Sequence, residues 1–474
     1  MTLKIAPICA AAIAAFCPLF GKDVYVSSSA GDDKNDGSIS APLRTIAAAP
    51  KDSVKLFLKR GDVFFETLQG FKNSEIDAYG DGKKPLLCGL KILGNNGAWE
   101  RMPLDVWRLD LAEQQNFGGY KAVGKTNNIG AIYYPEEDKI YGHLVQRAAM
   151  LAADGDFWAG DAFYATNVQS PKTQFKYLYF KSKKHPSELG KTVSFITYSY
   201  GIRDLRNCTV RNIAVKGFGV HGVSRAWNCR FENLEIDLIG GSVQLSYPQW
   251  VRLGNGVEFW ISTNNPCNNN TVAGCKISRT YDCGATIQGH GETLKAENIK
   301  FVGNYFFRCR QAFEHFLTAK KSAAYANCEF SDNKCFDMGE NEFSTPESRD
   351  ANLLSYERNP IEGLSIRNNI FWGAPVYALH SHPAKLENNT FYVYRGQYLR
   401  HNRGKPEETI WADSEADVEK FKSAVGDASD KFVIVERSDT QLRREVLESA
   451  FAPQKEKIER KTREKYRRDS FFRK

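Results

Sequence analysis

The sequence between residues 207 and 394 repeats one short pattern. Each copy has a run of alternating apolar residues, an Asn or a near-equivalent, a second short run, and then a Gly or another turn residue. The seven copies cover residues 208–219, 229–241, 270–284, 299–311, 328–339, 364–375 and 384–394. Their recurring polar residues are Asn212, Asn233, Cys275, Asn304, Asn333, Asn369 and Asn389, which are 21, 42, 29, 29, 36 and 20 residues apart. Such spacing is typical of a solenoid in which each unit is one coil.

The runs in each coil are predicted to be strands. Apolar residues alternate over four to six positions, as at Val210, Ile213 and Val215, and the runs end at Gly, Asn or Asp. Asn suits a tight corner because it tolerates left-handed dihedral angles. Asn side chains stacked at a strand spacing of about 4.8 Å can also bond to their copies in the next coil.

The N-terminus carries a predicted export signal. Residues 1–21 offer a positive end at Lys4, an apolar stretch from Ile5 to Phe20 and a small residue at Gly21. A membrane anchor is the alternative, but the stretch is short for a span and contains two prolines. No later segment is long and apolar enough to cross a bilayer. We therefore expect a secreted or periplasmic protein with no membrane span after signal removal.

The net charge of +8 does not indicate a nucleic-acid partner. Residues 453–474 hold ten Lys or Arg and four Asp or Glu, a charge of +6, which leaves only +2 for the rest of the chain. A binding surface for an anionic polymer would need a basic body. The C-terminal segment is interpreted as a solvated helix or a frayed end.

Cysteines are scattered rather than paired. Of eleven, Cys9 and Cys17 leave with the signal, and the other nine show no CxxC spacing. Cys208 and Cys229 each come four residues before a coil Asn, so they should stack as buried, small apolar side chains. A disulfide stays possible in an exported protein, and a metal site is not expected.

Two N-terminal segments resemble a known superfamily. Residues 25–46 contain YVS, a loop rich in Gly, Asp and Asn, then AP and Thr-Ile, and residues 56–69 read LFLKRGDVFFETLQ. These segments, the LYF and HP motifs at residues 178–186, and the seven repeat copies resemble secreted pectin-lyase-like, right-handed parallel β-helix proteins. The resemblance implies a polysaccharide lyase or glycoside hydrolase type of protein, although this superfamily hosts several activities and some members with none.

The predicted fold is all-β: a right-handed single-stranded parallel β-helix with an N-terminal capping segment, a β-rich insertion and a partly helical C-terminal tail. The expected divisions are residues 1–21 (signal), 22–94 (N-terminal cap and first coils), 95–200 (insertion flanking the helix), 201–400 (main coils) and 401–474 (tail). Helices are expected at Thr45–Ala49, Glu415–Val425 and Gln441–Phe451. The acidic loop AGDDKNDGS (residues 30–38) admits a calcium site as an alternative to plain turns, but we expect no cofactor.

Aligning the second strand of each coil brings polar residues into one file. The segments are residues 218–223, 254–260, 284–289, 312–316 and 375–380. Val257, Phe259, Ala285 and Ile287 are predicted to face inward. The outward file is then His221, Glu258, Gln288 or Thr286, Glu314 and His380. Asp282, Arg252 and His290 lie beside it, and Trp260 and Phe316 extend the same strands.

Two carboxylates in this file suit glycosidic hydrolysis. Glu258 and Glu314 should lie two coils apart, about 9.5 Å at the backbone, and inverting glycosidases hold their acid and base about 6.5–9.5 Å apart. Asp282 could form a closer pair with either. Predicted catalytic residues are therefore Glu258, Glu314 and Asp282. The predicted substrate-binding residues are His221, Arg252, Trp260, Gln288, His290 and His315. Of these, His315 could instead face the core.

Two alternatives remain open. The first is β-elimination on a uronic-acid polymer, for which the candidate bases or charge-neutralising groups are Arg252, Arg279, Arg308, Arg310 and His221. Because the sequence has no run of Asp at coil spacing, a calcium-dependent lyase is disfavoured and a metal-free lyase stays open. The second is an exported carbohydrate-binding solenoid without catalysis. All three hypotheses give the protein a polysaccharide or oligosaccharide partner and no nucleic acid, and we expect a monomer.

Overall fold

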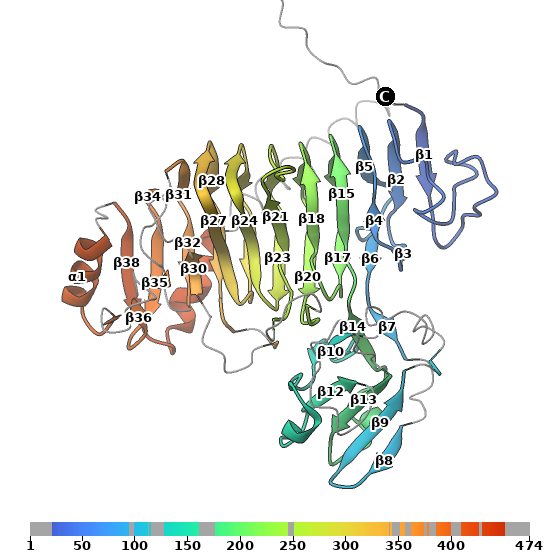
Figure 1. The fold of residues 1–474 in the computed structure, drawn as a ribbon, viewed down its shortest axis with the longest axis horizontal. Coiled ribbons are helices and arrows are strands. Elements are labelled where there is room, and N and C mark those ends of the chain that lie inside the picture. Colours follow the sequence, from blue (N-terminus) through green and yellow to red (C-terminus); the bar gives the residue numbers. More distant parts are fainter. Residues whose placement is uncertain are drawn as a thin grey trace, which may run out of the picture.

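The computed structural model describes residues 21–93, 99–111, 113–114, 128–160, 176–244, 251–340, 342–343, 351–355, 362–373, 377–378, 385–399, 409–425 and 429–450. Three long parallel sheets run along the molecule, and the central coils each contribute one strand to each sheet (Figure 1). This arrangement confirms the predicted parallel β-helix. The predicted signal at residues 1–21 lies outside the described residues except for Gly21.

The first sheet, sheet A, has ten strands: β1 Asp23–Val26, β2 Lys55–Lys59, β5 Glu75–Tyr79, β16 Thr209–Arg211, β19 Arg230–Glu232, β22 Thr271–Ala273, β25 Lys300–Val302, β28 Cys328–Ser331, β31 Leu364–Arg367 and β34 Lys385–Glu387. Sheet B has eight: β4 Leu68–Gln69, β15 Ile202–Arg206, β18 Val223–Trp227, β21 Val257–Ile261, β24 Cys283–Glu297, β27 Gln311–Ala326, β30 Ala351–Ser355 and β33 Tyr377–Ala378. Sheet C has ten: β3 Val63–Phe64, β6 Leu86–Cys88, β17 Ala214–Lys216, β20 Glu235–Ile239, β23 Lys276–Thr280, β26 Tyr305–Phe307, β29 Lys334–Phe336, β32 Ile370–Trp372, β35 Thr390–Tyr394 and β38 Lys431–Val435.

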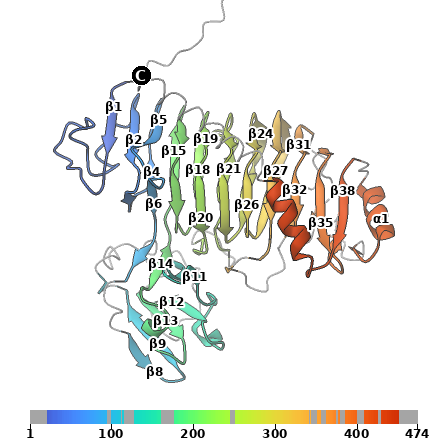
Figure 2. The ribbon, with the colours of Figure 1, turned by 180° about the vertical axis from the view of Figure 1, so that it is seen from behind.

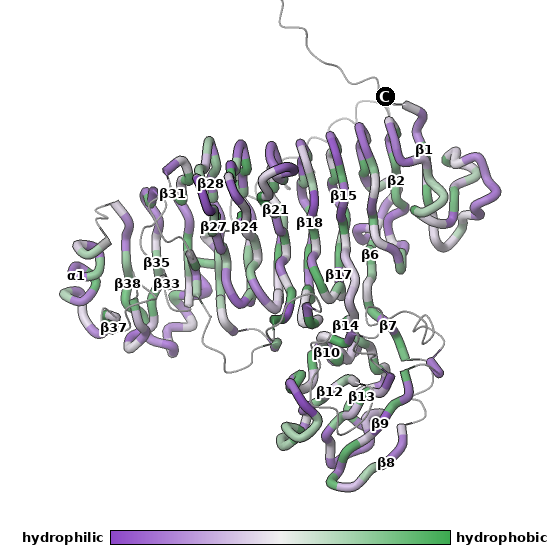
Figure 3. Tube along the Cα trace, in the orientation of Figure 1, coloured by the Kyte–Doolittle hydropathy of each residue, from purple (hydrophilic) through white to green (hydrophobic). Residues whose placement is uncertain are grey.

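Hydrophilic and hydrophobic residues are mixed along the strands (Figure 3). Alternate side chains of a strand point to opposite faces, and the buried apolar ones form the core of the helix. Val257, Phe259, Ala285 and Ile287 are all fully buried in this core, so their predicted inward orientation is confirmed. Aromatic rings stack from coil to coil: the ring centroids of Phe371 and Phe391 are 4.7 Å apart. That distance equals the strand spacing, because register places like residues directly above one another.

The corner between sheets A and C uses Asn in two adjacent positions, not in one as the sequence suggested. Asn212 and Asn233 have φ angles of 62° and 51° and stand at the left-handed position, where Asn212 is half-buried and Asn233 is exposed. Asn304, Asn333, Asn369 and Asn389 stand one residue later in the coil and are buried. The backbone requirement and the stacking requirement are therefore met by different residues.

The buried Asn residues form a continuous hydrogen-bonded ladder. The Oδ1 atom of Asn333 accepts from the backbone N–H of Asn304 at 2.9 Å, and its own side-chain amide donates to the carbonyl of Phe301 at 3.0 Å. Asn369 and Asn389 repeat the pattern, and Asp430 ends it by accepting from the backbone N–H of Asn389 at 2.8 Å. Each rung satisfies backbone groups that no strand partner reaches at the corner.

A second, exposed Asn ladder precedes sheet A and was not anticipated from the sequence. Asn269, Asn298 and Asn327 have φ angles of 60°, 53° and 54°. The side-chain amide of each later residue donates to the Oδ1 atom of the previous one at 2.8 Å. At this corner, therefore, the same Asn residues adopt the left-handed backbone and form the side-chain stack.

Residues between β6 and β15 form the predicted β-rich insertion, which lies beside the helix (Figure 1). Its first antiparallel sheet contains β7 Lys91–Ile92, β10 Ile129–Tyr134, β11 Lys139–Ile140 and β14 Ser194–Thr197; its second contains β8 Glu100–Met102, β9 Val106–Asp110, β12 Phe157–Gly160 and β13 Tyr177–Lys181. Short 3₁₀ turns occupy Ala148–Met150 and Pro186–Glu188. A separate apolar cluster that includes Trp158 and Phe180 gives the insertion a core of its own.

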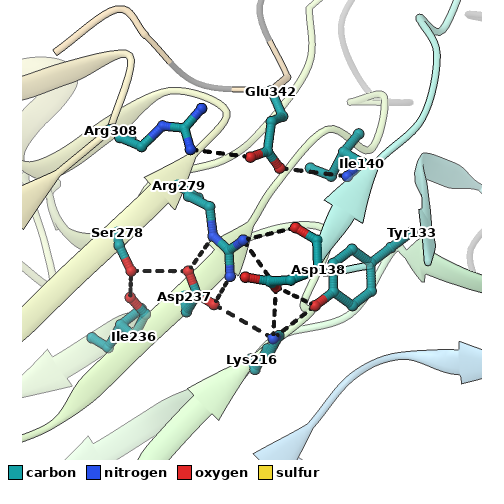
Figure 4. Close-up of polar contacts among 10 residues, drawn as sticks. All are labelled: Tyr133, Asp138, Ile140, Lys216, Ile236, Asp237, Ser278, Arg279, Arg308 and Glu342. Carbon is teal, nitrogen blue, oxygen red and sulfur yellow. Dashed lines mark hydrogen bonds and ion pairs between the residues drawn. The ribbon is translucent and has the colours of Figure 1, made fainter. Parts of the chain in front are cut away.

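The insertion is fastened to sheet C by charged side chains (Figure 4). Arg279 on β23 pairs with Asp237 on β20 through two bonds of 2.8 and 2.5 Å, and with Asp138 in the β10–β11 turn at 3.0 Å. Lys216 donates to the hydroxyl of Tyr133 at 2.9 Å. Burial lowers the pKa of Arg279, but Asp237 and Asp138 raise it by more, so the guanidinium stays charged.

Both ends of the helix are covered. At the N-terminal end, the helix expected at Thr45–Ala49 is instead a turn. The Glu66 carboxylate accepts the N–H groups of Ile46 and Ala47, and the Ile46 side chain enters the core. Asp33 accepts the N–H group of Thr45 as well, so the cap is a loop held by two acidic side chains.

The C-terminal end is closed by α1 Glu415–Val425, which confirms the predicted helix, and Phe421 from α1 packs edge-on against Phe432 at 5.7 Å. The pair β36 Tyr398–Leu399 and β37 Ile410–Trp411 precedes α1. A second helix at 440–450 matches the other prediction except for Phe451, which lies outside the described residues. It crosses the outer face of sheet C (Figure 2).

All nine cysteines from Cys88 to Cys335 are buried thiols. Cys208 and Cys229 lie on adjacent coils as predicted, since their neighbours Thr209 and Arg230 are in register. Within the described ranges, no helix has the length and apolar character needed to cross a bilayer.

We expect Asn333→Ala to lower the free energy of unfolding by about 2–4 kcal/mol. It removes the acceptor for the backbone N–H of Asn304 and leaves that buried group unpaired. Urea unfolding followed by circular dichroism measures the change. Asn298→Gly is the matched control, because it keeps the left-handed backbone of an exposed rung; a loss of less than about 1 kcal/mol is expected there. Equal losses in the two variants would contradict a stabilising role specific to the buried ladder.

Candidate functional site

The outer face of sheet B carries the acidic file. Strand register places Ser224, Glu258, Thr286, Glu314 and Leu354 in one row across β18, β21, β24, β27 and β30. Glu258 and Glu314 therefore lie two strands apart, about 9.6 Å at the backbone. Parallel register brings these two carboxylates, 56 residues apart in sequence, to neighbouring places on one face.

The observed row differs from the predicted file in three members. His221 lies two residues before Val223 and so is level with Asn255, in the register row three residues before that of Glu258. Gln288 is in register with Trp260, so Thr286 is the residue between the two carboxylates. Strand β30 intervenes between β27 and β33 and was absent from the sequence alignment. His380 lies outside the described residues.

Glu258 is held by a buried hydrogen-bond network. Its Oε2 atom is 2.5 Å from Nε2 of His221 and 3.4 Å from the side-chain amide of Asn255. The backbone N–H of Asn255 lies 3.3 Å from Nδ1 of His221 and orients the ring. Glu258 and His221 are only 8% and 6% exposed.

The charge state of Glu258 follows from two opposing effects. Burial alone raises the pKa of this carboxyl, because a low-dielectric environment disfavours charge. The charge and hydrogen bond offered by His221 and the amide of Asn255 lower it by more, and the pKa lies below its ordinary value. Glu258 is therefore an ionised carboxylate at neutral pH.

A chain of contacts links Asn255 to the second carboxylate. The Sγ atom of Cys283 is 3.2 Å from Oδ1 of Asn255 and 3.2 Å from Oε2 of Glu314. Burial, with the nearby charges of Glu314 and Asp282, raises the pKa of the Cys283 thiol well above its ordinary value. The thiol is thus protonated and has one hydrogen to donate to either oxygen.

Asp282 joins this group. A carboxylate oxygen of Asp282, the Cys283 sulfur and a carboxylate oxygen of Glu314 all lie within 4.8 Å of one another. The same three atoms could surround a divalent ion, which would first have to displace the thiol proton.

The acidic loop at residues 30–38 uses its carboxylates differently: Asp33 accepts from the backbone N–H groups of Arg44 and Thr45.

An aromatic shelf adjoins the acidic row. The shelf consists of Trp260, Gln288 and Phe316. Each comes two residues after a member of the acidic row, and the three are in register and only partly buried. The exposed ring of His290 lies 5.7 Å from Trp260 and 5.2 Å from Phe316. The hydroxyl of Thr286 donates to Oε1 of Gln288 at 3.3 Å, which connects the shelf to the acidic row.

Two predicted binding residues do not lie on this face. Arg252 is buried and donates to the carbonyls of Gly241 and Gly130 at 2.7 and 2.8 Å, so it ties the insertion to the helix. His315 is in register with the core residue Ile287 and packs against Phe313 and Tyr325. Alternation places His315 inward because Glu314 faces outward.

The insertion adjoins the acidic group. Tyr281, the residue before Asp282, packs in one apolar cluster with Ala131 and Tyr133 of β10. Farther along the same corner, a cavity of about 300 Å³ lies between the neck of the insertion and the helix; its lining includes Thr67, Lys91, Ile92, Ser199 and Phe218. A wall and a cavity therefore flank the N-terminal ends of the sheet B strands.

Asn255 and Cys283 are the participants that sequence reasoning missed. Both stand two residues before an inward strand residue, Val257 and Ala285. An alignment extended by two positions would have shown His221, Asn255 and Cys283 as one row. Their contacts with the carboxylates could not be read from the sequence, because they depend on how the corner bends.

No family model matches the chain, and no curated protein does. Among solved structures, the chain is similar to a XylC–xylose complex (10% identity, 87% of this chain and 83% of that chain, TM-score 0.44) and to a glycoside hydrolase (9%, 81% and 95%, 0.42). It is also similar to the GH136 lacto-N-biosidase of Eubacterium ramulus (15%, 88% and 67%, 0.34). Likenesses this distant decide neither substrate nor reaction.

The lowered pKa of Glu258 predicts an acid-sensitive contribution to stability. A carboxyl that ionises more readily in the folded state adds stability above its unfolded pKa, about 4.3, and that stability is lost as pH falls through the folded pKa. Thermal unfolding between pH 2.5 and 7 should therefore show a shallower acid loss for Glu258→Gln than for wild type. Glu292→Gln, at a half-buried position on the neighbouring strand β24, should follow wild type; a Glu258→Gln profile identical to wild type would contradict the assignment.

Proposed function

We propose that the protein is a carbohydrate-active enzyme that hydrolyses a glycosidic bond in a polysaccharide or oligosaccharide. The observation that carries the proposal is the row Glu258–Thr286–Glu314, in which two carboxylates lie two strands apart on one face. The backbone separation of about 9.6 Å is just above the range of about 6.5–9.5 Å for the carboxyl groups of inverting glycosidases, and side chains that lean together bring the carboxyl groups closer.

Glu258 is the proposed general base. Its pKa is below the ordinary value, so it is ionised and ready to accept a proton. Both described hydrogen bonds go to Oε2, from His221 and Asn255. Oε1 is then the atom that takes the proton of an attacking water, while His221 acts as a positioning residue.

Glu314 is the proposed general acid, with Asp282 beside it. Carboxylate oxygens of the two residues lie within 4.8 Å of each other, and the proposal gives the proton to one of this pair. The Cys283 thiol contacts Glu314 and fixes the orientation of its carboxyl. The pair thereby supplies the protonated group that a departing sugar oxygen needs.

The proposed step balances in protons and bonds. Water attacks the anomeric carbon and gives its proton to Oε1 of Glu258, while the bond from that carbon to the glycosidic oxygen breaks. The leaving oxygen takes the proton held by Glu314 or Asp282. Trp260 and Phe316, on the neighbouring register row, offer ring faces for a sugar.

β-Elimination is less well supported. It requires a base or a charge-neutralising group on this face, and three of the five candidates are engaged elsewhere. Arg252 binds two carbonyls, Arg279 pairs with Asp237 and Asp138, and Arg308 pairs with Glu342 at 3.3 Å. Arg310, the fourth, lies 5.5 Å from the ring centroid of Tyr281, the residue before Asp282, so it stays a candidate. His221 faces Glu258.

A binding-only solenoid is the second candidate, and one observation favours it. Glu258 and Glu314 are 8% and 6% exposed, so a substrate has to gain access to groups that are nearly covered. Such a protein would bind a glycan and release no product. Export of the protein and a monomeric state remain part of the proposal.

Glu258→Gln and Glu314→Gln should each lower kcat about 10²–10⁴-fold, since each removes one half of the acid–base pair. Activity is measured on a panel of neutral and acidic polysaccharides by release of reducing ends. Glu292→Gln on β24 is the control, and it should retain wild-type turnover because its carboxylate pairs with Lys320 at the surface. Turnover unchanged in either carboxylate variant would refute the assignment.

The product distinguishes the three hypotheses. Hydrolysis gives new reducing ends without ultraviolet absorbance, elimination gives an unsaturated sugar that absorbs in the ultraviolet, and a binding protein gives neither while retaining the glycan.

Trp260→Ala should raise KM about 5–50-fold with a smaller change in kcat, because the ring contributes stacking of about 1–2 kcal/mol rather than proton transfer. Steady-state kinetics on the best substrate of the panel measures the split. Trp411→Ala, at an exposed Trp near the C-terminal end, is the matched control. A fall in kcat alone would contradict a stacking role for Trp260.

A further inference from the structure

A second groove lies on sheet C, away from the acidic row. Its cavity of about 350 Å³ is bounded by β20, β23, β26 and β29 and by Leu447 of the C-terminal helix. One register row crosses it: Glu235, Lys276, Tyr305 and Lys334. Lys276 and Lys334 stand on the strands either side of Tyr305, so two ammonium groups flank one aromatic ring.

These two lysines carry uncompensated charge. Lys84 at the groove edge pairs with Glu235 at 3.0 Å, which neutralises both. Lys334 donates to the neutral carbonyl of Asp332 at 2.6 Å. Within the part of the chain that the structure describes, no carboxylate pairs with Lys276 or Lys334, so the centre of the groove is positive.

Charged residues further along β20 and β23 show the contrast. Asp237 lies two residues after Glu235 and Arg279 three residues after Lys276, and Arg279 pairs with both Asp237 and Asp138 of the insertion (Figure 4). Cations on that side of sheet C are part of the attachment of the insertion. Lys276 and Lys334 have no such structural use.

The floor of the groove is aromatic. Phe307 and Phe336 extend the strands of Tyr305 and Lys334 and contact Leu447 in one apolar cluster with the C-terminal helix. The hydroxyl of Tyr305 lies 3.4 Å from the carbonyl of Ala450, which fixes the ring against the end of that helix. Figure 2 shows this helix crossing the sheet beside β26 and β32.

We propose that this groove binds an acidic oligosaccharide, with sugar rings against Tyr305 and Phe307 and carboxylates paired with Lys276 and Lys334. Rings beside cations suit a ligand that combines a flat ring face with negative charge. The basic segment at residues 453–474, with a charge of +6, is disfavoured as an occupant because its charge has the same sign as the groove.

Binding here is independent of the proposed hydrolysis and can be measured in the Glu258→Gln full-length protein, which is not expected to consume the ligand. The probe is a hexasaccharide of galacturonic acid, and its fully methyl-esterified form is the matched neutral ligand. Titration calorimetry in 20 mM and 300 mM NaCl should show binding of the acid form that weakens with salt and weak or absent binding of the ester.

Charge reversal locates the site. Lys276→Glu and Lys334→Glu should each weaken binding about five- to tenfold at low salt, and Lys276→Met should weaken it less while keeping the apolar stem. Lys431→Glu is the control, since Lys431 is exposed in the same register row but three coils beyond Lys334. Thermal unfolding confirms that each variant is folded.

Three results would overturn the proposal: equal binding of acid and ester, binding that is unaffected by Lys276→Glu and Lys334→Glu, or no binding of the acid form. Turnover that is unchanged in Glu258→Gln or Glu314→Gln, with this binding retained, would count against the hydrolase proposal and leave the groove intact. Loss of binding with turnover preserved in the Lys276 and Lys334 variants would support a site separate from the acidic row.

Discussion

The stacking of coils at strand spacing is the constraint on which the rest of this protein depends. Parallel register places each residue directly above its equivalent in the next coil, so like side chains stack and repeat the same contact along the axis. Asn333 and Asn369 do this at the buried corner, and Phe371 and Phe391 do so in the core. Because every rung supplies hydrogen bonds to backbone groups that the corner leaves unpaired, the ladder stabilises the bend as well as the stack.

The same register creates the candidate site and gives it an unusual electrostatic character. Carboxylates that repeat along one face would repel if they stood on adjacent strands, and Thr286 separates Glu258 from Glu314 in the row. Each of these two side chains is then held from the corner of the coil: Glu258 by His221 and Asn255, Glu314 by the Cys283 thiol. The strands set the spacing, and the bends before them supply the contacts that orient the two groups.

The outer faces of sheets B and C differ in how the insertion contacts their charged residues. On sheet C, one row of charged residues is neutralised by the insertion through Asp237, Arg279 and Asp138, whereas the next row leaves Lys276 and Lys334 without a carboxylate partner. On sheet B, the insertion packs against Tyr281 and so stands beside Asp282. A single appended unit therefore shapes the surroundings of both surfaces, and it can do so because its own apolar core holds its two sheets together.

The sequence by itself determined the coil, the strand alternation, the insertion and the α1 helix, because each depends on residue periodicity and local propensity. It also predicted that Glu258 and Glu314 share one face, and the strand register places them in one row. Only the tertiary structure decided that the Asn pattern covers two positions, that His221 is level with Asn255, that His315 faces the core and that Arg252 bonds two carbonyls. A shift of one residue in a strand reverses the face of a side chain, and that register depends on corner lengths that the alignment could not fix. Contacts such as Cys283 with Glu314 and Arg252 with Gly130 join residues that only the folded corners bring together.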